Sequence, residues 1–203
     1  MGIQAIIWDL GGVLVRTRDY KPREVLAAKY GMSRLELEDL VFGGESGTRA
    51  QLGLIDNNQH WRHIQLALHL SQTELADFQF AFWGADQLDE PLIAYIRALR
   101  TRYKTGLLSN NFPNLRQLIT SKWKITDAFD EMVISAEIGV LKPEALAYQI
   151  ALDKLDVQAA ETIFIDDFEH NLEGARAVGL HTIHFRSSEQ IIRDLNHILG
   201  ESV

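Results

Sequence analysis

The chain has 203 residues, of which 46% are hydrophobic and 24% are charged, the ordinary balance of a globular protein. This length suits one α/β domain with a sizeable core, with or without a small insert. The net charge of −8 argues against nucleic acid or an anionic membrane as the main partner, because both bind a basic surface. The absence of cysteine excludes disulfides, thiolate zinc sites and cysteine nucleophiles. With no apolar stretch of transmembrane length and no signal-peptide pattern at the start, we expect a cytoplasmic protein.

Short apolar runs alternate with segments of helical periodicity along most of the chain. The runs predict buried strands over Gln4–Trp8, Thr105–Leu108, Met132–Ile134, Thr162–Ile165 and His181–Phe185. The periodic segments predict helices over Glu90–Tyr103, Pro143–Leu155 and Leu172–Val178. Asp89 is placed to cap the first of these helices, Pro143 to occupy the first turn of the second and Gly179 to end the third. Strands that alternate with helices form parallel βαβ units, so we predict an α/β fold with a doubly wound parallel sheet.

Residues 16–85 interrupt this alternation, since they contain helix signals and no convincing strand. The serine-x-x-glutamate pattern of a capping box occurs twice, at Ser33–Glu36 and Ser71–Glu74. Further helices are expected over His60–Leu70 and Ala76–Trp83. We therefore predict a small helical subdomain at 16–85, inserted after the first strand of an α/β core that is formed by residues 1–15 and 86–203.

Polar residues stand at or just past the ends of the predicted strands, where an open parallel sheet binds its ligands. They are Asp9 after the first strand, Ser109 and Asn110 after the second, Lys142 just past the third, and Asp166 and Asp167 after the fourth. Each of these residues alone is more often a turn former, a helix flank or a cap than a functional group. Together they are harder to explain in this way, because three carboxylates at one edge raise one another's pKa unless a cation neutralises them. A hard divalent metal ion, with the lysine, would supply that positive charge.

Four stretches of the sequence, in this order along the chain, resemble the four motifs of the haloacid dehalogenase superfamily. They are WDLGGVL around Asp9, LLSNN around Ser109 and Asn110, GVLKPE around Lys142, and FIDDFEHNLEGA around Asp166 and Asp167. The resemblance covers essentially the whole chain, with residues 16–85 at the position of that family's helical cap. The first motif reads Asp-Leu-Gly, and in this it resembles the first motif of the small sugar-phosphate phosphatases, a branch that includes glucose-1-phosphate phosphatase-like proteins.

The resemblance implies hydrolysis of a small organic phosphate monoester through an aspartyl-phosphate intermediate on Asp9. It implies catalytic roles for Asp9 and Lys142. It also implies that the phosphate is bound by the Ser109 hydroxyl, the Asn110 backbone N–H and Lys142. The expected partner is thus a small phosphorylated metabolite, with no nucleic acid and no membrane, and the protein could form a homodimer.

The resemblance also implies a Mg²⁺ cofactor. Its ligands would be Asp9, the backbone carbonyl of Gly11 and Asp167. Asp166 would stand behind them as a supporting carboxylate, although the two neighbouring aspartates could exchange roles. Asn171 is expected to orient the loop that carries them.

Gly11 departs from the family's usual pattern. The phosphatases of the family usually carry a second aspartate here, two residues after the nucleophile, as general acid and base. Such help is typically worth about 10²–10⁴-fold in rate, or roughly 2.7–5.5 kcal/mol of barrier. The protein could act on substrates with good leaving groups, such as acyl phosphates, or take the proton from His60, His63 or a bound water. We favour a slow or substrate-restricted phosphatase.

Two other functions stay open on the same scaffold. A 2-haloacid dehalogenase would use Asp9 to attack carbon and would also lack the second aspartate. Such enzymes need no metal, however, and do not usually keep an acidic pair like Asp166 and Asp167. A catalytically weak binding or regulatory protein would explain Gly11 but not the otherwise complete motifs. A phosphoryl-accepting receiver domain is excluded, because receivers place their acidic pair after the first strand.

Overall fold

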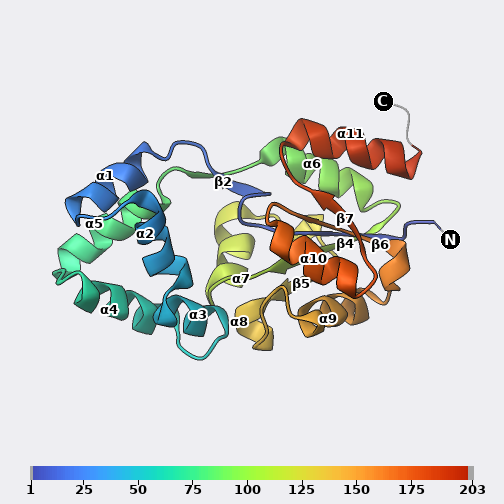
Figure 1. Ribbon diagram of the computed structural model, residues 1–203. Coiled ribbons are helices and arrows are strands. Elements are labelled where there is room, and N and C mark those ends of the chain that lie inside the picture. The colour runs from blue at the N-terminus through green and yellow to red at the C-terminus, as the bar shows by residue number, and fades with distance from the viewer. Residues whose placement is uncertain (1, 201–203) are drawn as a thin grey trace.

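A five-stranded parallel sheet forms the centre of the molecule, of which the computed structural model describes residues 2–200 (Figure 1). The strand order is β5-β4-β1-β6-β7. The strands are β1 (Ala5–Trp8), β4 (Lys104–Ser109), β5 (Glu131–Ile134), β6 (Thr162–Asp166) and β7 (His181–His184). The predicted α/β fold is confirmed, and each predicted strand lies within one residue of its expected bounds.

Helices cover both faces of this sheet, which is why successive residues of its central strands are buried rather than alternating between buried and exposed (Figure 1). One face carries α6 (Glu90–Leu99) and α11 (Ser188–Leu199), and the other carries α9 (Ala145–Leu155) and α10 (Glu169–Ala177). In β1, Ile6 and Trp8 pack with the first pair of helices and Ile7 with the second, because successive strand residues point to opposite faces. Shorter turns complete this part: α7 (Leu115–Gln117), η2 (Leu118–Trp123), η3 (Thr126–Ala128), α8 (Ser135–Ile138) and η4 (Ala159–Glu161).

A group of helices lies beside the sheet, on the side opposite the N-terminus in Figure 1. It consists of α1 (Lys21–Lys29), α2 (Arg34–Glu38), η1 (Asp39–Gly43), α3 (Glu45–Gln51), α4 (Asn57–Ala67) and α5 (Gln72–Trp83). Their buried side chains form a hydrophobic cluster of their own, which Phe112 joins from the loop after β4. None of the helices within residues 2–200 is long and apolar enough to cross a bilayer.

The two connections between this helical group and the sheet pair with each other. β2 (Val15–Thr17) and β3 (Asp86–Leu88) form an antiparallel pair, and the Thr17 hydroxyl donates a hydrogen bond of 2.6 Å to Asp86. The expectation that residues 16–85 contain no strand is therefore wrong in this detail. Strands of three residues are too short to display an alternating pattern.

The predicted helix caps are confirmed. The hydroxyls of Ser33 and Ser71 accept hydrogen bonds from the third backbone N–H of α2 and α5, as capping boxes require. Asp89 caps α6 by accepting from the Leu92 N–H. Gly179 follows α10 with a φ of +92°, a conformation that glycine adopts without strain.

Several predicted helix bounds are wrong. α10 begins at Glu169 rather than Leu172, α5 begins at Gln72 rather than Ala76, and α4 ends at Ala67 rather than Leu70. α6 ends at Leu99 rather than Tyr103. α9 begins at Ala145, so Pro143, which follows a cis peptide bond, precedes the helix instead of opening it. α4 begins three residues earlier than expected, because Asp56 and Gln59 form a further capping box.

Candidate active site

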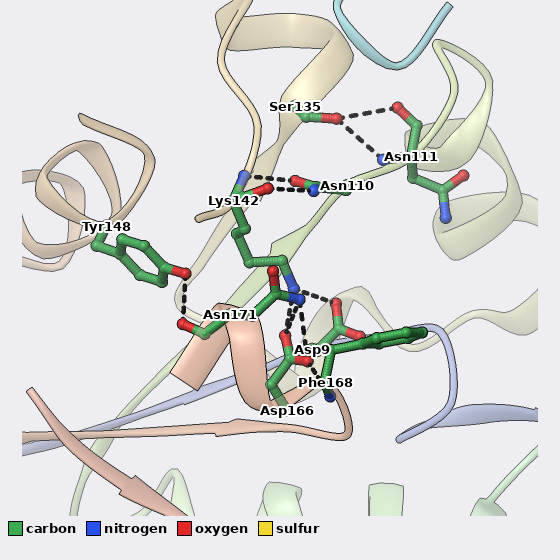
Figure 2. A network of polar contacts seen from close by, with 9 residues as sticks. All are labelled: Asp9, Asn110, Asn111, Ser135, Lys142, Tyr148, Asp166, Phe168 and Asn171. Atoms are coloured by element: carbon green, nitrogen blue, oxygen red, sulfur yellow. Dashed lines mark hydrogen bonds and ion pairs between the residues drawn. The ribbon is translucent and has the colours of Figure 1, made fainter. Parts of the chain in front are cut away.

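Two carboxylates and one ammonium group form a buried ion-pair cluster at the carboxyl edge of the sheet. Asp9 follows β1 and Asp166 ends β6, and the neighbouring strands bring them together. Lys142 Nζ lies 2.7 Å from Asp9 Oδ1 and 2.6 Å from Asp166 Oδ2 (Figure 2). All three side chains are buried: Asp9 is 9% exposed, Asp166 0% and Lys142 1%. The structure thus joins residues that stand 133 and 24 positions apart in the sequence.

The cluster carries more negative charge than its lysine neutralises. Burial raises the pKa of Asp9 to about 7; Lys142 lowers it, while Asp166 and Asp167 raise it further. Burial, with a contribution from Asp166, raises the pKa of Asp167 to about 6. Burial alone would lower the pKa of Lys142, but Asp9 and Asp166 outweigh it and hold that pKa above its ordinary value. A further positive charge would relieve the repulsion among the carboxylates.

The oxygens of the three aspartates fit a hard divalent cation. One carboxylate oxygen each from Asp9, Asp166 and Asp167 lie within 4.8 Å of one another. Asp167 Oδ1 is buried and has no hydrogen-bond partner among the described residues. Asp166, in contrast, already accepts from Lys142, from the Phe168 N–H at 2.8 Å and from Asn171 Nδ2 at 3.1 and 3.0 Å. Of the two neighbours, Asp167 therefore has the oxygen left to bind a metal ion.

Two glycines after Asp9 have different surroundings. Gly12 has a φ of +79°, and a Cβ at this position would lie 2.1 Å from Asp167 Oδ2. Its N–H donates to the Val15 carbonyl at 2.9 Å, which closes the tight turn. Gly11 is exposed, and a Cβ there would meet no atom within 4 Å. The position of the family's usual second aspartate is therefore open space.

Ser109 and Asn110, the residues predicted to bind phosphate, lie at the carboxyl end of β4. Ser109 is buried as the last residue of that strand. No hydrogen bond among the described residues joins its hydroxyl to Asp9, Lys142 or Asp166. The side chain of Asn110 is hydrogen-bonded to the backbone of Lys142 (Figure 2). The structure therefore places the asparagine against the lysine loop.

Other polar residues support the site, and sequence reasoning missed two of them. The buried Ser135 hydroxyl accepts from the Asn111 N–H at 2.9 Å and lies 3.3 Å from the Asn111 carbonyl. The Tyr148 hydroxyl donates to the Asn171 carbonyl at 2.6 Å. Ser135 directly follows β5, so the strand-end rule that selected Asp9 could have selected it. Tyr148 lies inside a helix and carries no such signal.

The two histidines considered as proton donors do not belong to this cluster. His60 is fully buried, with Nδ1 3.1 Å from the Ser46 hydroxyl and its ring centroid 4.8 Å from that of Phe112. Burial lowers the pKa of His60 to about 4, so the ring is neutral at pH 7. His63 is exposed on α4, with Nδ1 2.7 Å from the Gln59 carbonyl. Within residues 2–200, neither histidine makes a hydrogen bond to the ion-pair cluster.

Known proteins share this fold and sequence pattern. The protein-family model of the haloacid dehalogenase-like hydrolases matches residues 3–179. Sesquiterpene phosphatase astK of Aspergillus oryzae is 26% identical over 204 residues, which cover 97% of both chains. Bifunctional epoxide hydrolase 2 of Rattus norvegicus is 29% identical over 122 residues, which cover 58% of this chain and 22% of the rat protein.

A solved structure supports the same assignment of the fold. The HAD family enzyme BT-2542 of Bacteroides thetaiotaomicron, in complex with magnesium and inorganic phosphate, superposes with a TM-score of 0.75 at 23% identity. The superposition covers 91% of this chain and 95% of that enzyme. The resemblance that the four motifs indicated is thus confirmed, and the chain belongs to the haloacid dehalogenase-like hydrolases.

Proposed function

We propose that this hydrolase cleaves a small organic phosphate monoester, with Mg²⁺ as cofactor and an aspartyl-phosphate formed on Asp9. The observation that carries the proposal is the buried contact of Lys142 with both Asp9 and Asp166, next to the unpartnered oxygen of Asp167. A buried ion pair is weak evidence for a stabilising role, because desolvation offsets most of the attraction. An excess of carboxylates around one lysine is better explained by a site that receives a cation and a phosphate.

In the proposed reaction, an Asp9 carboxylate oxygen attacks phosphorus, and the bond from phosphorus to the leaving oxygen breaks. Water then hydrolyses the acyl phosphate, which releases inorganic phosphate and restores Asp9. Lys142, fixed by Asp166, orients the nucleophile and stabilises negative charge on the transferring group. The Ser109 hydroxyl and the Asn110 N–H hold the phosphate oxygens.

Asp9, the Gly11 carbonyl and Asp167 would hold the Mg²⁺, with Asp166 fixing the lysine and the loop that follows β6. When bound, the cation supplies positive charge that offsets the charge of the phosphate and of the carboxylates. Two observations of this chain support that assignment: the free, buried oxygen of Asp167 and the side-chain-free turn at Gly12 that makes room for it.

Gly11 limits which phosphates the enzyme can cleave quickly. No acid stands at this position to protonate the leaving oxygen, and within residues 2–200 neither His60 nor His63 is hydrogen-bonded to the cluster. We therefore propose a phosphatase that prefers good leaving groups. The helices α1–α5 would act as its cap, which would cover the site and set specificity. The similarity to the phosphatase astK and to BT-2542, which binds magnesium and phosphate, supports a phosphatase without identifying the substrate.

The test is phosphate release from p-nitrophenyl phosphate and acetyl phosphate, with Mg²⁺ and with EDTA, beside halide release from a 2-haloacid. We expect release of phosphate that needs Mg²⁺ and no release of halide. Halide release without metal would instead support the dehalogenase. If a folded sample with any metal released neither product, the protein would be a binding or regulatory protein.

A further inference from the structure

The backbone of Lys142 is held by the side chain of Asn110. Asn110 Nδ2 donates to the Lys142 carbonyl at 2.9 Å, and the Lys142 N–H donates to Asn110 Oδ1 at 2.8 Å (Figure 2). One amide therefore satisfies both backbone groups of the lysine. Among the side chains, only asparagine and glutamine carry such a donor and acceptor side by side.

This pair of hydrogen bonds matters because Lys142 lies outside the helices and strands. It stands between α8, which ends at Ile138, and α9, which begins at Ala145. Its backbone thus has no ladder or helical turn to fix it, while buried backbone groups need partners. Lys142 is 4% exposed, so water is a poor substitute for the amide.

Both ends of Lys142 are consequently fixed. Figure 2 shows the backbone bound by Asn110 and the ammonium group bound by Asp9 and Asp166. Asn110 directly follows Ser109, the last residue of β4, and β4 pairs with β1, the strand that Asp9 directly follows. The asparagine therefore ties the lysine loop to the strand next to the nucleophile.

We propose that the Asn110 side chain is a positioning residue, which sets the reach of Lys142 to Asp9 and to the transferred phosphoryl group. This role is separate from the phosphate contact assigned above to its backbone N–H. It rests on the proposed function for its effect on turnover, but the placement of Lys142 can be measured without turnover.

The test uses Asn110→Leu, which keeps the backbone N–H and a similar shape but removes both hydrogen bonds. The matched control is Asn114→Leu, a neighbouring asparagine that makes no cap hydrogen bond at the start of α7. With acetyl phosphate and Mg²⁺, we expect Asn110→Leu to lower kcat by up to about 100-fold, because a misplacement near 1 Å has that effect. KM should change little, and the control should match the wild type.

A double variant separates positioning from direct contact with substrate. In the Lys142→Ala background, Asn110→Leu should not lower kcat further, because the group it positions is gone. Asn110→Leu should also lower the urea midpoint, both in the wild type and in Lys142→Ala, because the backbone groups of residue 142 lose their partner in each. If Asn110→Leu lowered kcat by an equal factor with and without the lysine side chain, the side chain would act on the substrate and the inference would be overturned.

A crystal structure of Asn110→Leu keeps this test distinct from that of the proposed function. If the wild type releases no phosphate, the proposed function fails, and the structure alone decides about Asn110. Lys142 Nζ displaced from Asp9 would support the inference. Lys142 Nζ still within hydrogen-bond distance of both Asp9 and Asp166 would overturn it.

Discussion

Gly12 and Asp167 lie so close together that no side chain fits between them. A Cβ on Gly12 would lie 2.1 Å from Asp167 Oδ2 and 2.5 Å from its Cγ. The turn after the proposed nucleophile is thus shaped around the carboxylate proposed to bind Mg²⁺. The two loops, one after β1 and one after β6, depend on each other for their conformation.

Gly12→Ala should therefore displace Asp167 and weaken metal binding. We expect the concentration of Mg²⁺ for half-maximal activity to rise at least about tenfold, a change of roughly 1.4 kcal/mol. Stability should fall by about 1–2 kcal/mol or more, because alanine is strained at a φ of +79°. Titration of activity with Mg²⁺ and unfolding in urea measure the two effects. Gly11→Ala is the control for stability, because a Cβ at Gly11 enters open space. An equal loss of stability in Gly12→Ala and Gly11→Ala would contradict this account.

Asp9→Asn should stabilise the metal-free protein at pH 8. The folded-state pKa of Asp9 is raised from 3.8 to about 7, mainly by burial, so the folded protein binds this proton more tightly than the unfolded chain. The stability that the protonated carboxyl contributes is complete below about pH 4 and is lost as the pH rises through 7. A pKa that differs by one pH unit between the folded and unfolded states corresponds to about 1.4 kcal/mol of stability.

The comparison of Asp9→Asn with the wild type cancels the contributions of titrating groups that Asp9 does not contact, such as His60. His60 acts in the opposite sense, because its pKa is lowered to about 4 and its contribution is lost as the pH falls. Urea unfolding in EDTA at pH 5 and pH 8 should show an advantage of Asp9→Asn that grows with pH. An advantage that stayed constant or shrank would mean that Asp9 is not a buried, destabilised carboxylate.

Gly11→Asp should improve the hydrolysis of phosphates with poor leaving groups. The new carboxyl enters open space and needs no positive φ, so the fold should tolerate it. If the missing acid limits the rate, kcat/KM for an alkyl phosphate should rise by about 10²-fold, while acetyl phosphate should gain far less. Gly11→Asn is the matched control, since its amide has a similar shape and cannot act as an acid. Equal rates for the Asp and Asn variants would point to another proton source.

Gly174→Ala should disturb Lys142 through Pro143, the next residue in the chain. A Cβ on Gly174 would lie 2.6 Å from the Pro143 carbonyl oxygen and 2.7 Å from Pro143 Cβ, so the residue after the lysine must move. We expect a loss of about 1–3 kcal/mol in stability, as in other overpacked sites, together with a fall in kcat. Glu173→Ala, on the exposed side of the same helix, should leave both unchanged. Full activity of Gly174→Ala would show that Lys142 tolerates a shift of its loop.

Much of the candidate site was predictable because apolar strands end in polar residues at one edge of a parallel sheet. Asp9 and Asp166 follow this rule, and the structure brings them together around Lys142. Ser135 follows the same rule after β5, so the rule could have selected it too, although a serine at a strand end is also a common turn residue. Four motif positions in order identified the family, which no single position could do.

Other features depend on contacts between residues far apart in the sequence, and local patterns do not encode them. His60 is buried because it packs on Phe112 and meets Ser46, 14 residues away. β2 and β3 are too short for a pattern of their own and exist through their pairing. The amide of Asn110 finds its partner 32 residues further along the chain.

The most direct test of the central claim is covalent labelling of Asp9 by a phosphoryl donor. Wild-type protein and Asp9→Asn are mixed with radiolabelled acetyl phosphate and Mg²⁺, quenched within the first turnovers, and the labelled peptide is identified by mass spectrometry. We predict label on the peptide that contains Asp9, sensitive to hydroxylamine as an acyl phosphate is, and none in Asp9→Asn. Phosphate release by Asp9→Asn at the wild-type rate, with no label on either protein, would contradict an aspartyl-phosphate mechanism.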